Sequence, residues 1–200
     1  HSKVILETAK AIGCYSDYAY LDDKYNQEDR PKSINGIPLI GSLSYLSSDF
    51  CKSKYNSAIV AIGDSLIRVS ILQKLLENYE VPSLIHPSAY VAPSATLDNG
   101  TVVFAQAAVQ SNSIVGKGSI INTCASIDHE VILSEGVHIC PGAHVAGNVR
   151  IGKSTWVGIG SSIIQNINIG SNVYIGAGSV VLKDINSGYR VAGVPARAIS

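Results

Sequence analysis

The stretch that decides the fold is VHICPGAHVAGNVRIGKSTWVGIGSSIIQNINIG, residues 137–170, where an aliphatic residue returns at every sixth position. The same spacing runs from Ile85 to Val181, and all seventeen residues of this series are Ile, Leu or Val. Four positions after each comes a residue that is small or β-branched. A period of six is three times the two-residue repeat of a strand and does not fit the 3.6-residue repeat of a helix. The pattern predicts short strands joined by bends, with the aliphatic residue pointing inward.

Three such strands close one triangular coil of eighteen residues, so each residue lies below the residue eighteen positions later. The series makes about 5.7 coils, and with strands stacked about 4.8 Å apart the prism is roughly 27 Å long. Glycines gather in the later repeats, where corners need a permissive backbone or a ligand needs close approach. We therefore expect a parallel β-helix of hexapeptide repeats over residues 84–200.

Before residue 84 the pattern changes to alternating helix and strand signals. Apolar residues from Val4 to Ile12 lie on one helical face, and Gly13 ends that helix. The segment YAYLDD, residues 18–23, has the pattern of a strand with two acids at its carboxyl end. These signals favour a small parallel α/β domain over residues 1–83.

The same domain has a second strand signal and a second helix signal. SAIVAIG, residues 57–63, has the pattern of a buried strand, and residues 64–80 have that of an amphipathic helix. Ligands of parallel α/β domains bind beyond the carboxyl ends of the strands. Asp22, Asp23 and Gly63 are expected at that rim.

Composition excludes several classes of function. Fifteen basic residues balance fifteen acidic ones, so no net charge favours nucleic acid or an anionic membrane as a partner. No apolar run reaches the roughly 18 residues of a membrane span, and nothing resembles a signal peptide. The cysteines at positions 14, 51, 124 and 140 have no zinc-type spacing, which fits reduced thiols that fill the core of a cytoplasmic protein.

INTCASIDHE, residues 121–130, is a polar cluster within the apolar repeat. Histidine is the side chain best suited to accept a proton near neutral pH, and a carboxylate partner fixes its tautomer and raises its basicity. Stacking puts Gly147 over His129, which leaves the imidazole face open and offers a backbone N–H to a developing oxyanion. Taken alone, however, a single histidine in a repeat is more often a solvated corner residue than a base.

The chain resembles, over essentially its full length, the bacterial sugar O/N-acetyltransferases with a Rossmann-like nucleotide-sugar domain before a left-handed parallel β-helix. It looks like the UDP-4-amino-sugar N-acetyltransferases of bacillosamine biosynthesis and the related sialic acid O-acetyltransferases. The resemblance is carried by HSKVILETAK, LDD, AIGD followed by Arg68, NTCASIDHE, HVAGNVRIGK and VAGVPAR. In that family a strand and a glycine-rich turn precede the motif that opens here at His1. The chain contains no methionine, so we expect this strand and turn to lie upstream of His1.

The resemblance implies a role for each residue that matches a family position. His129 is the general base, and Glu130 orients it. Groups that hold acetyl-coenzyme A are His138, expected on the next face of the prism, and the backbone at Gly147, Ile159 and Ala177. Groups that bind the sugar nucleotide are His1, Asp22, Asp23, Gly63 and Asn122. Arg68 fits a solvated helix face equally well, and His86 and His144 are interpreted as structural or surface residues.

The reaction implied by the resemblance is direct acetyl transfer to the 4-amino group of a UDP-sugar, without a metal or a covalent enzyme intermediate. The active sites would lie between subunits of a homotrimer, and the unbroken repeat also favours neighbours that cover an exposed face. Two alternatives stay open: a sialic acid O-acetyltransferase, in which His129 activates a hydroxyl, and a binding β-helix without chemistry. The spacing of His129, His138 and His144 does not match the three-histidine metal site of a carbonic anhydrase.

Overall fold

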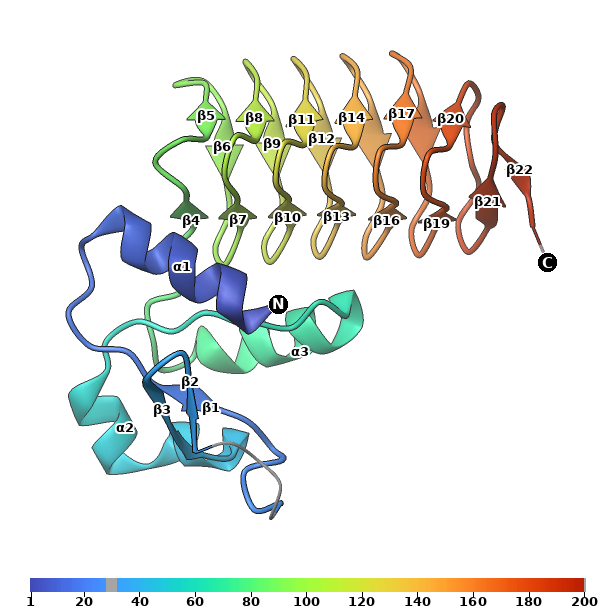
Figure 1. Ribbon diagram of the computed structural model, residues 1–200. Coiled ribbons are helices and arrows are strands. Elements are labelled where there is room, and N and C mark those ends of the chain that lie inside the picture. The colour runs from blue at the N-terminus through green and yellow to red at the C-terminus, as the bar shows by residue number, and fades with distance from the viewer. Residues whose placement is uncertain (28–31, 200) are drawn as a thin grey trace.

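The computed structural model describes residues 1–27 and 32–199 and has two parts, an N-terminal unit and a three-faced prism of stacked strands (Figure 1). Ser200, the last residue of the second expected domain, lies outside the described residues. The N-terminal unit lies beneath the first coils of the prism, and the later coils extend beyond it (Figure 1). Its helices α1 and α3 are the elements nearest the prism (Figure 1).

The prism contains seventeen two-residue strands, β4 to β20, within residues 84–181, which the structure describes without a gap. The second residue of each strand belongs to the six-residue aliphatic series and packs in the central core. Each strand pairs in parallel with the strand eighteen residues away, as Ile121 does with Ile139. The predicted triangular coil is therefore confirmed. The strand bounds are β4 Leu84–Ile85, β5 Tyr90–Val91, β6 Thr96–Leu97, β7 Val102–Val103, β8 Ala108–Val109, β9 Ile114–Val115, β10 Ile120–Ile121, β11 Ser126–Ile127, β12 Ile132–Leu133, β13 His138–Ile139, β14 His144–Val145, β15 Arg150–Ile151, β16 Trp156–Val157, β17 Ser162–Ile163, β18 Asn168–Ile169, β19 Tyr174–Ile175 and β20 Val180–Val181.

The strands form three parallel faces, named here by their order along the coil. Face one contains β4, β7, β10, β13, β16 and β19, and is extended by β21 (Arg190–Ala192) and the antiparallel β22 (Arg197–Ala198). Face two contains β5, β8, β11, β14, β17 and β20. Face three contains β6, β9, β12, β15 and β18.

The small residues of the repeat fill the narrow space beside each bend. Ser113 and Ser161 are fully buried there, and their hydroxyls donate to the carbonyls of Asp128 and Gly176 at 2.7 and 2.9 Å. Buried hydroxyls need such partners, because an unpaired polar group in the core costs free energy. Because its hydroxyl is hydrogen-bonded, a serine can occupy the same buried position that alanine or valine occupies in other coils.

A second six-residue rhythm marks the corners. Every sixth residue from Gly100 to Gly178 has a positive φ, which side chains other than glycine adopt at a cost. Glycine or asparagine occupies most of these positions, because these two residues adopt a positive φ at the lowest cost. The other occupants are Gln106, Cys124, Glu130 and Ser154.

The N-terminal unit begins with α1 (Ser2–Ile12), which ends at Gly13 with φ 76°, as predicted. Strand β1 (Tyr20–Leu21) pairs in parallel with β3 (Ile37–Gly41), and β3 pairs antiparallel with β2 (Ser33–Ile34). The remaining elements are a 3₁₀-helix η1 (Leu43–Ser47), α2 (Asp49–Lys54) and α3 (Ser65–Leu75). The expected helix over residues 64–80 is thus confirmed but shorter.

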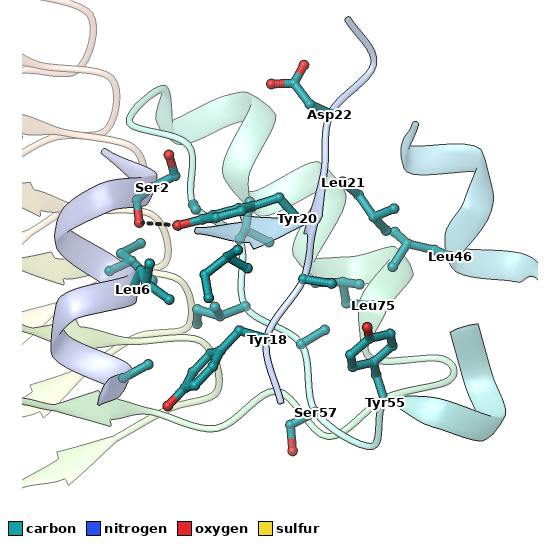
Figure 2. A pocket seen from close by; sticks show the side chains of 18 of the residues that line it. Ser2, Leu6, Tyr18, Tyr20, Leu21, Asp22, Leu46, Tyr55, Ser57 and Leu75 are labelled. Carbon is teal, nitrogen blue, oxygen red and sulfur yellow. Dashed lines mark hydrogen bonds between the residues drawn. The ribbon is translucent and has the colours of Figure 1, made fainter. Parts of the chain in front are cut away.

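The prediction that SAIVAIG forms a sheet strand is wrong. Ser57 makes an isolated bridge to Glu80, and residues 58–63 pair with no strand among the described residues. A cavity of about 450 Å³ lies between this segment and the YAYLDD segment, of which only two residues are strand. Figure 2 shows its lining, which includes Leu6 of α1 and Leu75 of α3.

Two helices fasten the N-terminal unit to the prism. Ile5 and Ala9 of α1 pack on Leu84, Val102 and Ile120, the outward residues of face one. Helix α3 lies on the corner column Gly100, Gly118 and Gly136, eighteen residues apart. A methyl group on these glycines would come within 2.8 to 3.0 Å of the side chains of Leu72 or Val69. The glycine column therefore lets α3 approach the prism closely.

Candidate active site

His129 and Glu130 lie side by side on the corner between β11 and β12, where faces two and three meet. Their side chains are 58% and 60% exposed, and His129 Nδ1 lies 3.2 Å from Glu130 Oε2. The backbone N–H of His129 donates to Asp128 Oδ1 at 2.7 Å, which shapes the turn. When Nδ1 donates to the carboxylate, Nε2 carries the lone pair and can accept a proton from a substrate.

Gly147 lies over the imidazole, as the eighteen-residue stacking predicts. A methyl group on Gly147 would come 2.5 Å from Cε1 and from Nε2 of His129, so the ring occupies the space that any larger residue would need. Within the described ranges, the backbone N–H of Gly147 donates to no protein acceptor. A free N–H beside the basic nitrogen can stabilise an oxyanion at that place.

His138 begins β13 on face one and is only 3% exposed. Its ring centroid lies 4.3 Å from that of Trp156 and 6.1 Å from that of His1. Desolvation by burial and the nearby charge of Arg68 lower the pKa of His138 to about 3. His138 is therefore neutral near pH 7 and holds no proton that titrates there.

Asn122 fixes the tautomer of His138. Asn122 Oδ1 accepts the N–H of Thr123 at 2.8 Å, so Nδ2 faces His138 Nε2 at 3.1 Å as a donor. His138 Nε2 then accepts, and the ring proton is on Nδ1. That Nδ1 is buried and has no partner in the part of the chain that the structure describes.

Ile159 and Ala177 lie in stacked turns on the corner between faces one and two. The Gly178 N–H donates to the Ile159 carbonyl at 2.7 Å, which joins the two turns. The Ile159 side chain is 59% exposed, and neither the Ile159 nor the Ala177 N–H donates to an acceptor in residues 1–27 or 32–199. This ridge offers a ligand two free backbone donors beside an apolar side chain.

The expected site residues fall into two groups on the prism. His129 and Gly147 share one corner, whereas His138, Ile159 and Ala177 belong to face one and the corner beside it. In a three-faced prism, the corner between faces two and three is opposite face one. The expectation that His138 lies on the adjoining face is therefore wrong, because β12 and face three intervene. One chain does not bring both groups to one ligand.

The acids of the N-terminal unit are held by local bonds. Asp22 Oδ1 accepts the N–H of Lys24 at 2.9 Å, and Asp23 Oδ1 accepts that of Leu43 at 3.0 Å. Figure 2 shows Asp22 just beyond Tyr20 at the end of the cavity, and Asp23 also lines it. These bonds shape the turn after β1.

His1 and Gly63 lie nearer the prism. The His1 ring packs against Phe104 at a centroid distance of 5.7 Å, so it contacts face one close to His138. Gly63 precedes α3, and a methyl group there would meet no atom within 4 Å. Tyr20 Oη donates to the Ser2 carbonyl at 3.4 Å and joins β1 to the start of α1 (Figure 2).

The sequence-based interpretation was least accurate for the environment of Arg68. It is 1% exposed, so the solvated interpretation is wrong. Its spacing from Leu72, Leu75 and Tyr79, all buried, puts it on the inner face of α3. That helical spacing was the signal that could have revealed its burial.

Other residues of note divide between surface and core. Cys51 and Cys140 are buried as expected, but Cys14 and Cys124 are exposed, so they do not fill the core. His144 is exposed, with Nδ1 2.8 Å from Ser126 Oγ, in agreement with a surface role.

No group of three or more metal-ligating side chains occurs among the described residues. Within those residues, no helix has the length and apolarity needed to cross a membrane.

Known proteins match both parts of the chain. Residues 1–75 match the PglD N-terminal domain family, and residues 148–183 match the bacterial transferase hexapeptide family of six repeats. The UDP-N-acetylbacillosamine N-acetyltransferase of Bacillus subtilis strain 168 is 36% identical over 108 residues. That match covers 52% of this chain and 47% of the relative, so it spans about half the length of that protein.

Solved structures match nearly the whole chain. The acetyltransferase domain of PglB from Neisseria gonorrhoeae FA1090, in complex with acetyl coenzyme A, is 40% identical with a TM-score of 0.91. The match covers 98% of this chain and 93% of that one. PerB from Caulobacter crescentus, in complex with CoA and GDP-perosamine, is 31% identical with a TM-score of 0.91 and coverages of 100% and 93%. The chain therefore belongs to the family of sugar N-acetyltransferases that join a PglD-type N-terminal domain to a left-handed parallel β-helix of hexapeptide repeats.

Proposed function

We propose that the chain transfers the acetyl group of acetyl-coenzyme A to the 4-amino group of a UDP-4-amino-sugar of the bacillosamine type. Residues 1–83 bind the sugar nucleotide and residues 84–200 carry the transfer. The observation that carries this proposal is the exposed His129–Glu130 pair, 3.2 Å apart, against Gly147. The relatives support the substrate class, because one is named for a UDP-linked amino sugar and another binds GDP-perosamine with CoA.

In the proposed reaction, the sugar nitrogen attacks the thioester carbonyl while His129 Nε2 takes a proton from it. The carbonyl oxygen becomes an oxyanion, which the free N–H of Gly147 stabilises. The C–S bond then breaks, and the thiolate of coenzyme A receives the proton from the imidazolium. Glu130 holds the ring by Nδ1 and stabilises its charged form in between. Atoms and charges balance without a metal or a covalent enzyme intermediate.

The donor site requires a second copy of the chain. His138, Ile159 and Ala177 of a neighbouring copy meet the His129 corner in a homotrimer, and acetyl-coenzyme A lies along the cleft between the prisms. The free N–H groups of Gly147, Ile159 and Ala177 support a role in holding this ligand through the backbone. His138, which is neutral, orients the acetyl end of the donor and does not compete for the proton.

The acceptor site uses the N-terminal unit and the adjoining part of face one. Asp22, Asp23 and the open backbone at Gly63 bind the nucleotide. His1 and Asn122 line the path of the sugar toward His138, because both lie beside its ring. Carboxylate oxygens are acceptors, which suits the N–H and hydroxyl donors of a uridine.

The proposal is tested by offering the protein acetyl-coenzyme A with a UDP-4-amino-sugar, a GDP-4-amino-sugar or sialic acid in parallel. Release of the coenzyme A thiol gives the rate, and mass spectrometry identifies the acetylated product. We expect the highest kcat/KM with the UDP-amine and an amide product. An ester product from sialic acid, with no reaction of either amine, would contradict the proposal.

A further inference from the structure

Arg68 is a buried cation that binds only neutral acceptors. Its Nε donates to the Gly118 carbonyl at 2.6 Å, and Nη2 donates to the Gly136 carbonyl at 3.0 Å. Nη1 donates to the carbonyls of Ile62 and Gly63 at 3.1 and 2.6 Å. The fifth bond runs from Nη2 to Ser65 Oγ at 3.2 Å. The guanidinium thus uses all five N–H donors on one turn of the N-terminal unit and two corners of the prism.

Burying the Arg68 charge among neutral acceptors costs free energy. Burial lowers the pKa of Arg68 to about 10, against the opposing effect of Asp64, so the side chain remains charged at neutral pH. Asp64 Oδ1 itself caps α3 by accepting the N–H of Ile67 at 2.9 Å. A buried charge without a bonded carboxylate is expensive, and apolar side chains would pack α3 more cheaply.

The acceptors of Arg68 indicate what the charge achieves. Gly118 and Gly136 are consecutive members of the corner column on which α3 lies. Ile62 and Gly63 form the turn just before α3, at the rim where the nucleotide binds in the proposed function. A planar guanidinium fixes the directions of its bonds, which a flexible ammonium with three donors does not. Arg68 therefore sets both the distance and the orientation between the turn and the prism.

We propose that Arg68 is a positioning residue that locks the Gly63 turn to the prism, so that a bound nucleotide presents its sugar amine to the transfer site. This inference rests on the proposed function. Reaction rates depend steeply on such alignment, since a misplacement of about 1 Å can cost on the order of 100-fold. An acceptor that reaches the transfer site without a nucleotide does not depend on the turn, and Arg68 should not affect it.

The test compares two acceptors in Arg68→Lys, which keeps the charge but has fewer and less directed donors. One acceptor is the UDP-4-amino-sugar, and the other is the free 4-amino sugar without the nucleotide. We expect kcat/KM for the UDP-linked acceptor to fall about 10- to 100-fold. The rate with the free sugar and the KM for acetyl-coenzyme A should stay within about twofold of wild type.

Lys74→Met is the matched control, because Lys74 is an exposed cation on the same helix. It should leave both acceptors unaffected, and thermal melting of each variant establishes that the proteins are folded. Equal losses with both acceptors in folded Arg68→Lys, or no loss with either, would overturn the positioning role. Failure of the wild-type protein to acetylate any nucleotide-linked amine would instead overturn the proposed function, so the two failures are distinguishable.

Discussion

Glu130 occupies a backbone position that asparagine or glycine fills at most other corners, with φ 58°. Holding a glutamate in the left-handed region costs roughly 1–2 kcal/mol. Its neighbour along this corner, Asn148, has the same conformation and donates from Nδ2 to Asn166 at 2.9 Å. Within residues 1–27 and 32–199, the Glu130 carboxylate bonds only to His129, which favours a functional reason for this side chain.

We predict that Glu130→Asn separates stability from activity. Asparagine suits the left-handed corner better, so the melting temperature should stay the same or rise. The kcat should fall, because the imidazole loses the acceptor that orients it. Thermal unfolding and acetyl transfer rates measured on the same preparation test both parts. A lower melting temperature with full activity would show that Glu130 serves the fold alone.

His129→Ala should reduce kcat by about 10²–10⁴, the range for removal of a general base. Affinity for acetyl-coenzyme A should persist, since Gly147 and the ridge of Ile159 do not depend on this side chain. The acidic limb of the kcat/KM profile against pH should disappear as well. His144→Ala is the control, because His144 is exposed and its side chain bonds to Ser126 on the same face of the prism. Wild-type kcat at neutral pH in His129→Ala would show that another group is the base.

His138 makes a prediction about stability and pH. Its pKa is lowered from 6.5 to about 3 in the folded protein, so between these values the unfolded chain binds more protons. The free energy of unfolding should therefore fall as the pH drops below 6.5, by up to about 1.4 kcal/mol per pH unit from this group. Urea denaturation from pH 7 to 4.5 should show a shallower loss in His138→Gln. Equal slopes would mean that His138 is protonated in the folded state.

At the scale of elements, the prism could be predicted and the N-terminal unit only in part. The six-residue aliphatic series repeats from Ile85 to Val181, so one local error cannot change the assignment. SAIVAIG carries no such repetition, and an apolar run does not distinguish a paired strand from a buried extended segment. The helical spacing of Arg68 indicated the inner face of α3, but its acceptors on Gly118 and Gly136 depend on the packing of α3 against the prism, which periodicity within the helix does not specify.

The candidate site was predictable to a similar degree. The pairing of His129 with Glu130 and the stacking of Gly147 followed from sequence adjacency and the eighteen-residue coil. The neutral state of His138 did not, because it arises from Trp156, Asn122 and Arg68, which come from different coils and from α3.

The close contact between α3 and the prism can be tested by comparing alanine substitutions at two glycines. Gly136 and Gly142 have similar positive φ angles of 70° and 63°, so alanine causes similar backbone strain at both. A methyl group at Gly136 would come 2.8 Å from Val69 Cγ2, whereas at Gly142 it would meet nothing within 4 Å. Gly136→Ala should therefore lose about 1–3 kcal/mol more stability than Gly142→Ala. If urea denaturation shows equal losses of unfolding free energy in the two variants, α3 moves to accommodate the methyl group without cost.

At the scale of the whole molecule, the distribution of functional groups favours an assembly. Face one is covered by α1 only over its first coils, where Leu84, Val102 and Ile120 pack on the helix. Beyond His138 it presents Trp156 and the partly exposed Tyr174, whose rings are stacked at 6.5 Å. The opposite corner carries His129. A neighbouring copy that brings its His129 corner to this face would complete the site and cover the aromatic side chains.

This arrangement predicts that two inactive variants restore one another. His129→Ala chains retain an intact His138 face, and His138→Ala chains retain an intact His129 corner. In a trimer formed at random from equal amounts of both, roughly a quarter of the sites combine the two intact halves. Co-expression with different affinity tags, followed by purification on both tags, isolates the mixed assemblies. We expect neither variant alone to transfer acetyl groups at an appreciable rate, and the mixed trimers to recover a substantial fraction of wild-type kcat. A monomeric mass by light scattering, or mixed assemblies as inactive as the parents, would instead place the complete site within one chain.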